Sequence, residues 1–178
     1  MFIAREKKRT NIAEYILYMW HIEDVMRGFG LDIRKVADWV NTMGLEPDKA
    51  AEMTEWYDNI IELMKNDGVT EKGHIRPIVN EMVELNELHL YLLYEKKDPD
   101  YMHAAAAVAE DLAVLRTKSG DVVGVSDVEL AFNALYGKLL LRMQHKEISG
   151  STDSAMNRIS AMLARLARAY ETMEKEEK

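Results

Sequence analysis

The sequence contains no cysteine. It can therefore form no disulfide bond and perform no thiolate chemistry, which fits a reducing compartment. Proline is also scarce, with three residues among 178, and no proline-rich or serine-rich linker divides the chain. We expect a single domain over residues 1–178, long enough to bury about 70% of its extended surface.

Long hydrophobic runs are missing as well. The apolar run from Tyr15 to Trp20 is far shorter than the roughly 20 residues that span a bilayer. At the N-terminus, Ile3 and Ala4 precede basic residues, whereas a secretory signal places its charges before its apolar core. We therefore expect a soluble cytoplasmic protein with no membrane partner.

The sequence also lacks the motifs of familiar reactions. It has no glycine-rich phosphate loop, and no serine nucleophile stands beside a histidine at a known spacing. The 31 acidic residues outnumber the 23 basic ones, and the resulting net charge of −8 disfavours general binding to nucleic acid or anionic lipid. We expect no catalytic residue, no metal, no cofactor and no nucleic-acid partner.

Apolar residues, in contrast, repeat alternately three and four positions apart through nearly the whole chain. This spacing places them on one face of an α-helix, and the alternation typical of strands is absent. The stripes predict seven helical segments joined by short connections: residues 10–27, 33–43, 46–66, 76–95, 98–119, 126–143 and from 152 onward. The sequence therefore predicts an all-α, single-domain antiparallel helical bundle of about seven helices.

Turn and capping residues mark where these helices begin and end. Gly44 is expected to cap the second segment, and Pro47 to open the third at a position where its missing N–H is harmless. Ser126 and Glu129 form a capping box at the start of the sixth segment, after a loop that carries Val122 and Val123. We expect the basic tip at 1–9 and the charged tail at 174–178 to fray.

The last segment has a broad apolar face. Leu163 and Leu166 lie on its stripe, and Ala167 and Ala169 widen the face beside them. Only two or more neighbouring elements can cover a face of this width. We therefore expect this helix to be central to the bundle or part of a subunit contact, and a homodimer is the simplest assembly.

The histidines provide the one candidate site. Glu14, Tyr18 and His21 share one face of the first segment, and His89 interrupts the apolar stripe of the fourth. If the two helices pack side by side, these four residues could form a polar pocket for a small ligand or a metal ion such as zinc or iron. The alternative is that His89 is a packed histidine that is hydrogen-bonded at the edge of the core.

The second and third segments flank a tight turn at Gly44, a spacing that loosely matches a helix-turn-helix. The third segment, which would be the recognition helix, carries many carboxylates, among them Glu52, Glu55 and Glu62. Such charges repel phosphates, so a nucleic-acid-binding regulator is only a second alternative function.

Residues 2–20, followed by Glu23-Asp24 and by residues 30–33, resemble the start of a family of uncharacterised bacterial proteins, described as a domain of unknown function. The resemblance is clearest over residues 1–45. Members of that family are all-helical and about as long as this chain, so the resemblance implies a bacterial helical domain. It implies no activity, ligand or site residue.

Together these observations lead us to expect a non-enzymatic cytoplasmic helical bundle that acts through protein–protein contacts, most simply as a homodimer. The alternative is a bundle that binds a small ligand or a metal around Glu14, Tyr18, His21 and His89.

Overall fold

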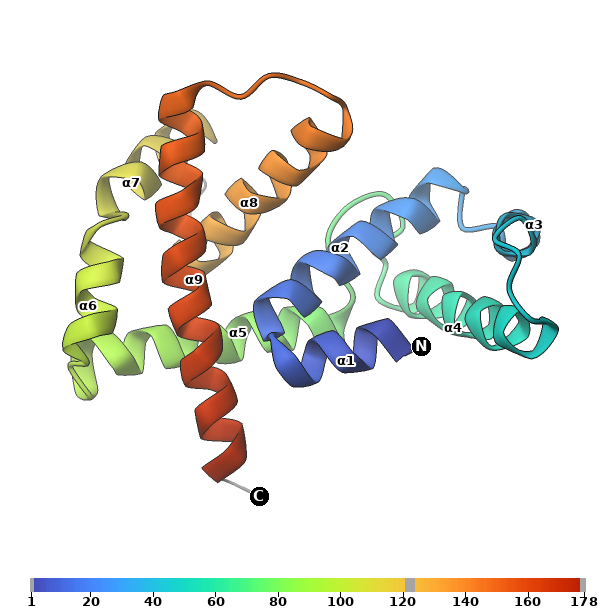
Figure 1. The fold of residues 1–178 in the computed structure, drawn as a ribbon, viewed down its shortest axis with the longest axis horizontal. Coiled ribbons are helices and arrows are strands. Elements are labelled where there is room, and N and C mark those ends of the chain that lie inside the picture. Colours follow the sequence, from blue (N-terminus) through green and yellow to red (C-terminus); the bar gives the residue numbers. More distant parts are fainter. Residues whose placement is uncertain (1, 121–123, 177–178) are drawn as a thin grey trace. The chain divides into compact units, whose positions relative to one another are not determined.

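The structure is a computed structural model that describes residues 2–120 and 124–176. Val122, Val123 and the end of the charged tail at 177–178 lie outside the described residues. Every regular element within the described ranges is a helix (Figure 1), which confirms the all-α prediction. The chain forms two compact units: unit 1 comprises Met1–Thr10 and Glu14–Glu81, and unit 2 comprises Asn11–Ala13 and Met82–Lys178. The prediction of a single domain stays a prediction.

Unit 1 contains the helices of the N-terminal half. They are α1 (Phe2–Thr10), most of α2 (Ile12–Gly28), α3 (Ile33–Asn41), α4 (Pro47–Asn66) and the start of α5 (Arg76–Leu90). Helices α3 and α4 pack against each other, with Gly44 in the connection between them at a φ of +65°. A glycine accepts this left-handed conformation without strain, which explains why the chain reverses here.

The core of unit 1 follows the predicted stripes. Ile16 and Met26 of α2, together with Ile61 and Met64 of α4, have no exposed surface. Their burial stabilises the unit through the hydrophobic effect, which contributes about 1.5–3 kcal/mol for each large apolar side chain. The predicted helix opening at Pro47 is also confirmed.

Helix α1 was not among the predicted helices. Residues 1–9 were expected to fray, but Phe2–Thr10 form a helix in which Ala4 is buried. Lys8 of this helix pairs with the buried Glu81 at the start of α5. The segment is therefore held by tertiary contacts that its own composition does not reveal. Fraying of the tip at residues 1–9 in solution stays a prediction.

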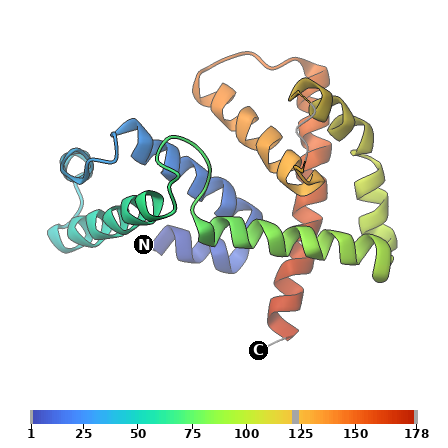
Figure 2. The ribbon, with the colours of Figure 1, turned by 180° about the vertical axis from the view of Figure 1, so that it is seen from behind.

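Unit 2 contains the rest of α5, a π-helix (Tyr91–Glu95), α6 (Pro99–Ala106), α7 (Ala109–Lys118), α8 (Asp127–Met143) and α9 (Gly150–Glu176). Figure 2 shows α8 leading through a connecting loop into α9, which passes beside it. Asp98 caps α6 by accepting a hydrogen bond from the Tyr101 N–H, and Ser126 caps α8 in the same way from the Glu129 N–H. The predicted helix start at Ser126 is thus confirmed.

The predicted number of helices was too low. The described residues form nine α-helices, because α1 is additional and the segment at 98–119 is divided into α6 and α7. The division falls at Ala107 and Val108, within an alanine-rich run that favours helix at every position. Val108 is only 1% exposed. The break therefore coincides with a side chain that packs into unit 2, and helix propensity alone does not predict it.

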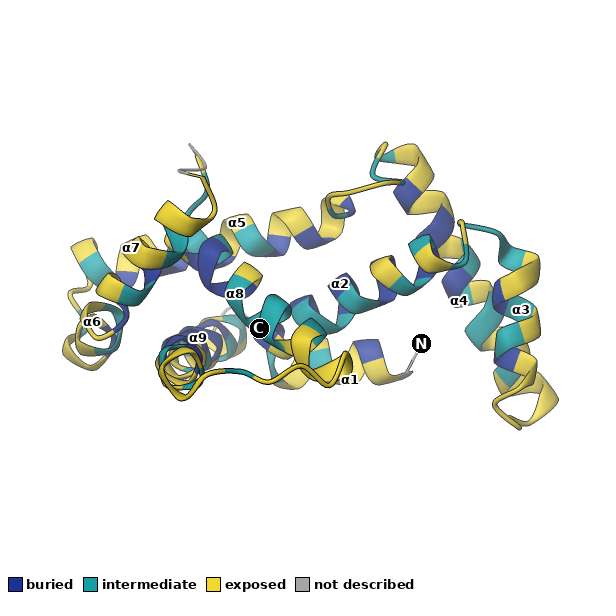
Figure 3. Cartoon of the chain, turned by 90° about the horizontal axis from the view of Figure 1, so that it is seen from above, coloured by how far each residue is buried: buried dark blue, intermediate teal, exposed yellow. Residues whose placement is uncertain are grey.

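Helix α9 carries the broad buried face that was predicted. Ile159 and Leu166 have no exposed surface, and Leu163 and Ala167 are also buried. Figure 3 shows buried positions on α9 in dark blue. Helices α6 and α8 both pack against α9, so two neighbours share the covering of its face. Within the described ranges, none of the helices is both long enough and apolar enough to cross a membrane.

Candidate functional site

His89 is a buried histidine in unit 2. It lies one residue before the end of α5 and is only 5% exposed, among the buried side chains of Leu85, Leu88 and Leu92. Its Nδ1 lies 2.6 Å from the hydroxyl oxygen of Tyr101, and the two rings meet edge to face. The expectation that His89 is packed and hydrogen-bonded is confirmed.

Tyr101 reaches His89 because a short turn after the π-helix changes the direction of the chain before α6 (Figure 1). Asp98 caps α6, and Pro99 occupies its first turn, so Tyr101 lies in the first turn of the helix with 3% of its surface exposed. This arrangement fixes the hydroxyl group against the imidazole ring.

Burial determines the protonation of both partners. It lowers the pKa of His89 below the ordinary value of 6.5, and the nearby carboxylate of Asp127 only partly opposes this effect. Burial also raises the pKa of Tyr101 well above its usual range. The hydrogen bond therefore joins a neutral imidazole to a neutral phenol at pH 7.

The second ring nitrogen of His89 is available for another interaction. Among the residues that the structure describes, Nε2 has no hydrogen-bond partner, and His89 lines a hollow of about 540 Å³. Because Nδ1 is engaged by Tyr101, the tautomer of the ring decides whether Nε2 donates or accepts a hydrogen bond there.

The walls of this hollow, which we call the His89 hollow, are mainly apolar. Large apolar side chains from α5, the π-helix, α6, α7 and α9 line it: Leu90, Leu93, Met102, Leu112 and Met162. Ala105, Ala106 and Ala109 leave space beside them because their side chains are small. A cavity of this kind suits an organic molecule of modest size.

Polar groups gather at one part of the hollow, where α7 meets the start of α8. Arg116 donates to the carboxylate of Asp127 at 2.8 Å and to the carbonyl oxygen of Val125 at 2.8 Å. Ser126 accepts the hydrogen bond that caps α8. Arg116 and Asp127 therefore form an ion pair in which the two charges balance each other, beside the serine hydroxyl that caps the helix.

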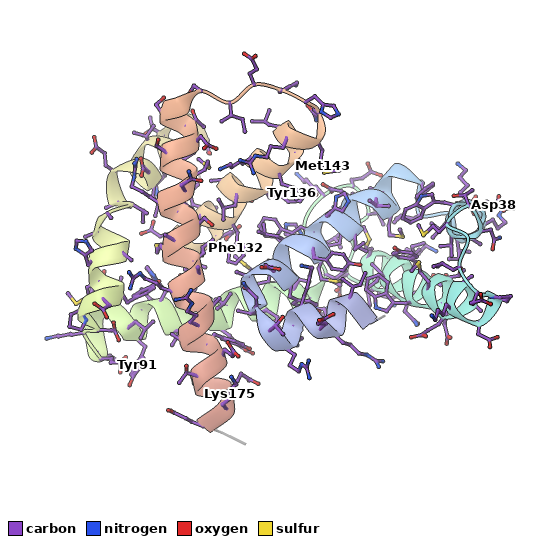
Figure 4. The ribbon with its side chains drawn as sticks, viewed as in Figure 1. Asp38, Tyr91, Phe132, Tyr136, Met143 and Lys175 are labelled. Atoms are coloured by element: carbon purple, nitrogen blue, oxygen red, sulfur yellow. The ribbon has the colours of Figure 1, made fainter. Side chains whose placement is uncertain are left out.

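The π-helix forms part of the wall of the His89 hollow. Its residues Leu93 and Tyr94 line the hollow, while Tyr91, labelled in Figure 4, is 46% exposed. The sequence predicted one uninterrupted helix over residues 76–95, from its apolar stripe. Short π-helical turns occur frequently at functional sites, and the sequence pattern gave no signal for this one.

The other predicted site residues lie on α2 in unit 1. Glu14 pairs with Lys7 at 2.8 Å and keeps 59% of its side chain exposed. Tyr18 is half-buried, which raises its pKa, and His21 is also half-buried. His89 belongs to unit 2, so a pocket shared by all four residues stays a prediction.

A metal ion was the other ligand predicted for these four residues. Across residues 2–120 and 124–176, no group of three or more histidine or carboxylate side chains is arranged to hold a metal ion.

A second polar cluster, in unit 1, was not predicted. The carboxylate of Glu23 is fully buried, contacts Nδ1 of His74 at 2.5 Å and accepts a hydrogen bond from the Ile75 N–H. Trp20 stacks on His74, and Arg27 donates to the carbonyl oxygen of Val69. These contacts hold the connection between α4 and α5 against α2, so the cluster has a structural role.

The comparison with known families assigns the chain to one family. Residues 1–177 match the family described as "Domain of unknown function (DUF4924)". The match spans nearly the whole sequence, so the chain belongs to this family, and the resemblance seen at residues 1–45 extends over the entire domain. No curated protein and no solved structure shows a detectable match.

The hydrogen bond between His89 and Tyr101 leads to a stability prediction. The substitution Tyr101→Phe leaves Nδ1 of the buried imidazole without its partner, and we expect the free energy of unfolding to fall by about 1–3 kcal/mol. Tyr94, which is 69% exposed, supplies the control, because Tyr94→Phe should change stability by less than about 0.5 kcal/mol. Urea unfolding followed by circular dichroism measures both variants. Equal stability of the two would contradict the prediction.

Proposed function

We propose that the protein binds a small, mostly apolar organic molecule in the His89 hollow and does not act as an enzyme. The observation that carries the proposal is the buried side chain of His89, whose Nδ1 lies 2.6 Å from the Tyr101 hydroxyl oxygen and which lines a hollow of about 540 Å³. Ligand pockets commonly combine apolar walls with a few fixed polar groups and have volumes of about 300–1,000 Å³.

The charges around the hollow favour a neutral ligand. Arg116 and Asp127 form an ion pair, and burial keeps His89 uncharged. An ionised ligand would lose hydration without meeting an unpaired opposite charge, which is unfavourable. A ligand with an apolar body and one hydrogen-bonding group can instead bury its body against Leu112 and Met162 and bind Nε2.

A neutral fluorescent probe tests this proposal. N-phenyl-1-naphthylamine has an apolar body and a single N–H group, and its emission rises in apolar surroundings. We expect it to bind the wild type, and Ala106→Phe, which fills the hollow, should weaken binding at least about tenfold.

Ala107→Phe is the matched control, because Ala107 is exposed and adjacent but does not line the hollow. Its affinity for the probe should equal that of the wild type. An absence of binding by the wild type, or an equal loss in both variants, would refute the proposed ligand site.

Self-association is a second proposed function, and it develops the expectation of a homodimer. Val83, Leu90 and Tyr94 are 51%, 44% and 69% exposed, and their spacing of seven and four residues places them on one side of α5 and the π-helix. Large apolar side chains grouped on a surface are typical of protein contacts. A second copy of the chain can cover the stripe with the same stripe about a twofold axis.

The oligomeric state tests self-association. We expect a dimer by light scattering at micromolar concentration, and Val83→Glu should convert it to a monomer because the contact would bury an unpaired charge. The control is Val114→Glu on α7, where the side chain is 47% exposed and lies outside the stripe. A monomeric wild type, or dissociation by Val114→Glu as well, would exclude this surface as the dimer contact.

We also propose that the protein is bacterial and cytoplasmic. The resemblance of residues 1–45 to bacterial proteins supports its origin, and a chain without cysteine is compatible with a reducing compartment.

A further inference from the structure

We propose that unit 1 contains a second, separate binding site, which takes a small apolar monocarboxylate. The site is a hollow of about 220 Å³ formed by α1, α2, α4 and the start of α5. We call it the Arg5 hollow. All of its lining residues belong to unit 1, so it is independent of the proposed function of the His89 hollow in unit 2.

The interior of the Arg5 hollow is apolar and partly aromatic. Met19, Ile60 and Ile75 line it and are 2%, 5% and 2% exposed. Tyr15 and Trp56 also line it and are half-buried, so they offer ring surface to a bound molecule. Aromatic walls of this kind favour a flat or branched apolar body.

Two cations of α1 lie beside this apolar surface. Lys8 pairs with the carboxylate of the buried Glu81, and its ammonium lies 5.7 Å from the centre of the Tyr15 ring. The charge of Lys8 is therefore balanced by Glu81. Arg5 is exposed, and within the described part of the chain no ion pair or hydrogen bond engages its guanidinium group.

The chemistry of Arg5 indicates the class of ligand. A guanidinium group presents parallel N–H donors that match the two oxygens of a carboxylate, and this pairing is among the stronger hydrogen-bonding arrangements in proteins. One unbalanced positive charge corresponds to a ligand with one negative charge. The volume of about 220 Å³ restricts the apolar body to about the size of a single ring.

Phenylacetate is a suitable probe, because it joins one ring to one carboxylate. Its neutral relative 2-phenylethanol has the same ring and no charge. Labelling with 5-fluorotryptophan allows binding to be followed by fluorine NMR, and the resonance of Trp56 is assigned by Trp56→Phe. We expect phenylacetate to shift the Trp56 resonance, and 2-phenylethanol to bind at least about tenfold more weakly.

Two variants on α1 test the role of Arg5. Arg5→Gln removes the charge from an exposed position and should weaken phenylacetate binding at least about tenfold. Arg9→Gln removes an exposed charge from the same helix outside the hollow and should leave binding unchanged. Leu63→Glu, which places a carboxylate in the wall of the hollow, should also weaken phenylacetate binding, by repulsion, and provides a second variant.

Several results would overturn the proposal. These are the absence of any shift of the Trp56 resonance with phenylacetate, equal affinity for 2-phenylethanol, and equal losses in the Arg5 and Arg9 variants. Failure of the naphthylamine probe to bind the His89 hollow would leave these outcomes unchanged, because the two hollows share no residue.

Discussion

A polar side chain that leaves water must recover its hydrogen bonds inside the protein, and this requirement connects the helices within each unit. The buried side chains of Glu23, Glu81 and His89 show this requirement. The first contacts His74, the second pairs with Lys8, and the third is hydrogen-bonded to Tyr101. Each partner belongs to a different segment of the chain. These pairs therefore help to position the α4–α5 connection, helix α1 and helix α6. Packing of the apolar stripes alone would allow other arrangements.

Most of the helices could be predicted because an apolar stripe is a local property of the sequence. The broad face of α9 and the cap at Ser126 were both visible without a structure. Helix α1 was not, because its basic residues dominate its composition and its stabilising partner, Glu81, lies 73 residues from Lys8. The break at Val108 was also missed, since it accompanies packing within unit 2 and the local propensity favours helix.

The candidate site could be predicted only in part. The position of His89 on an apolar stripe indicated its burial, but its partner Tyr101 lies across a π-helix and a turn that the stripe does not describe. The interpretation that joined His89 to the polar face of α2 depended on how two helices pack, which residue spacing does not specify. The Arg5 hollow likewise required α1 to be folded, so a basic tip considered alone gave no indication of it.

The state of His89 is central to this account, because a neutral imidazole with one occupied nitrogen and one available nitrogen defines the proposed ligand site. A long-range ¹H–¹⁵N NMR spectrum of its ring, recorded from about pH 5 to about pH 8, measures this state directly. We expect the ring to be a single neutral tautomer at pH 7 and the midpoint of its protonation to lie below the ordinary histidine pKa of 6.5. We also expect the naphthylamine probe to shift the Nε2 resonance. A protonation midpoint at or above pH 6.5, or an Nε2 resonance that does not respond to the bound probe, would contradict the account.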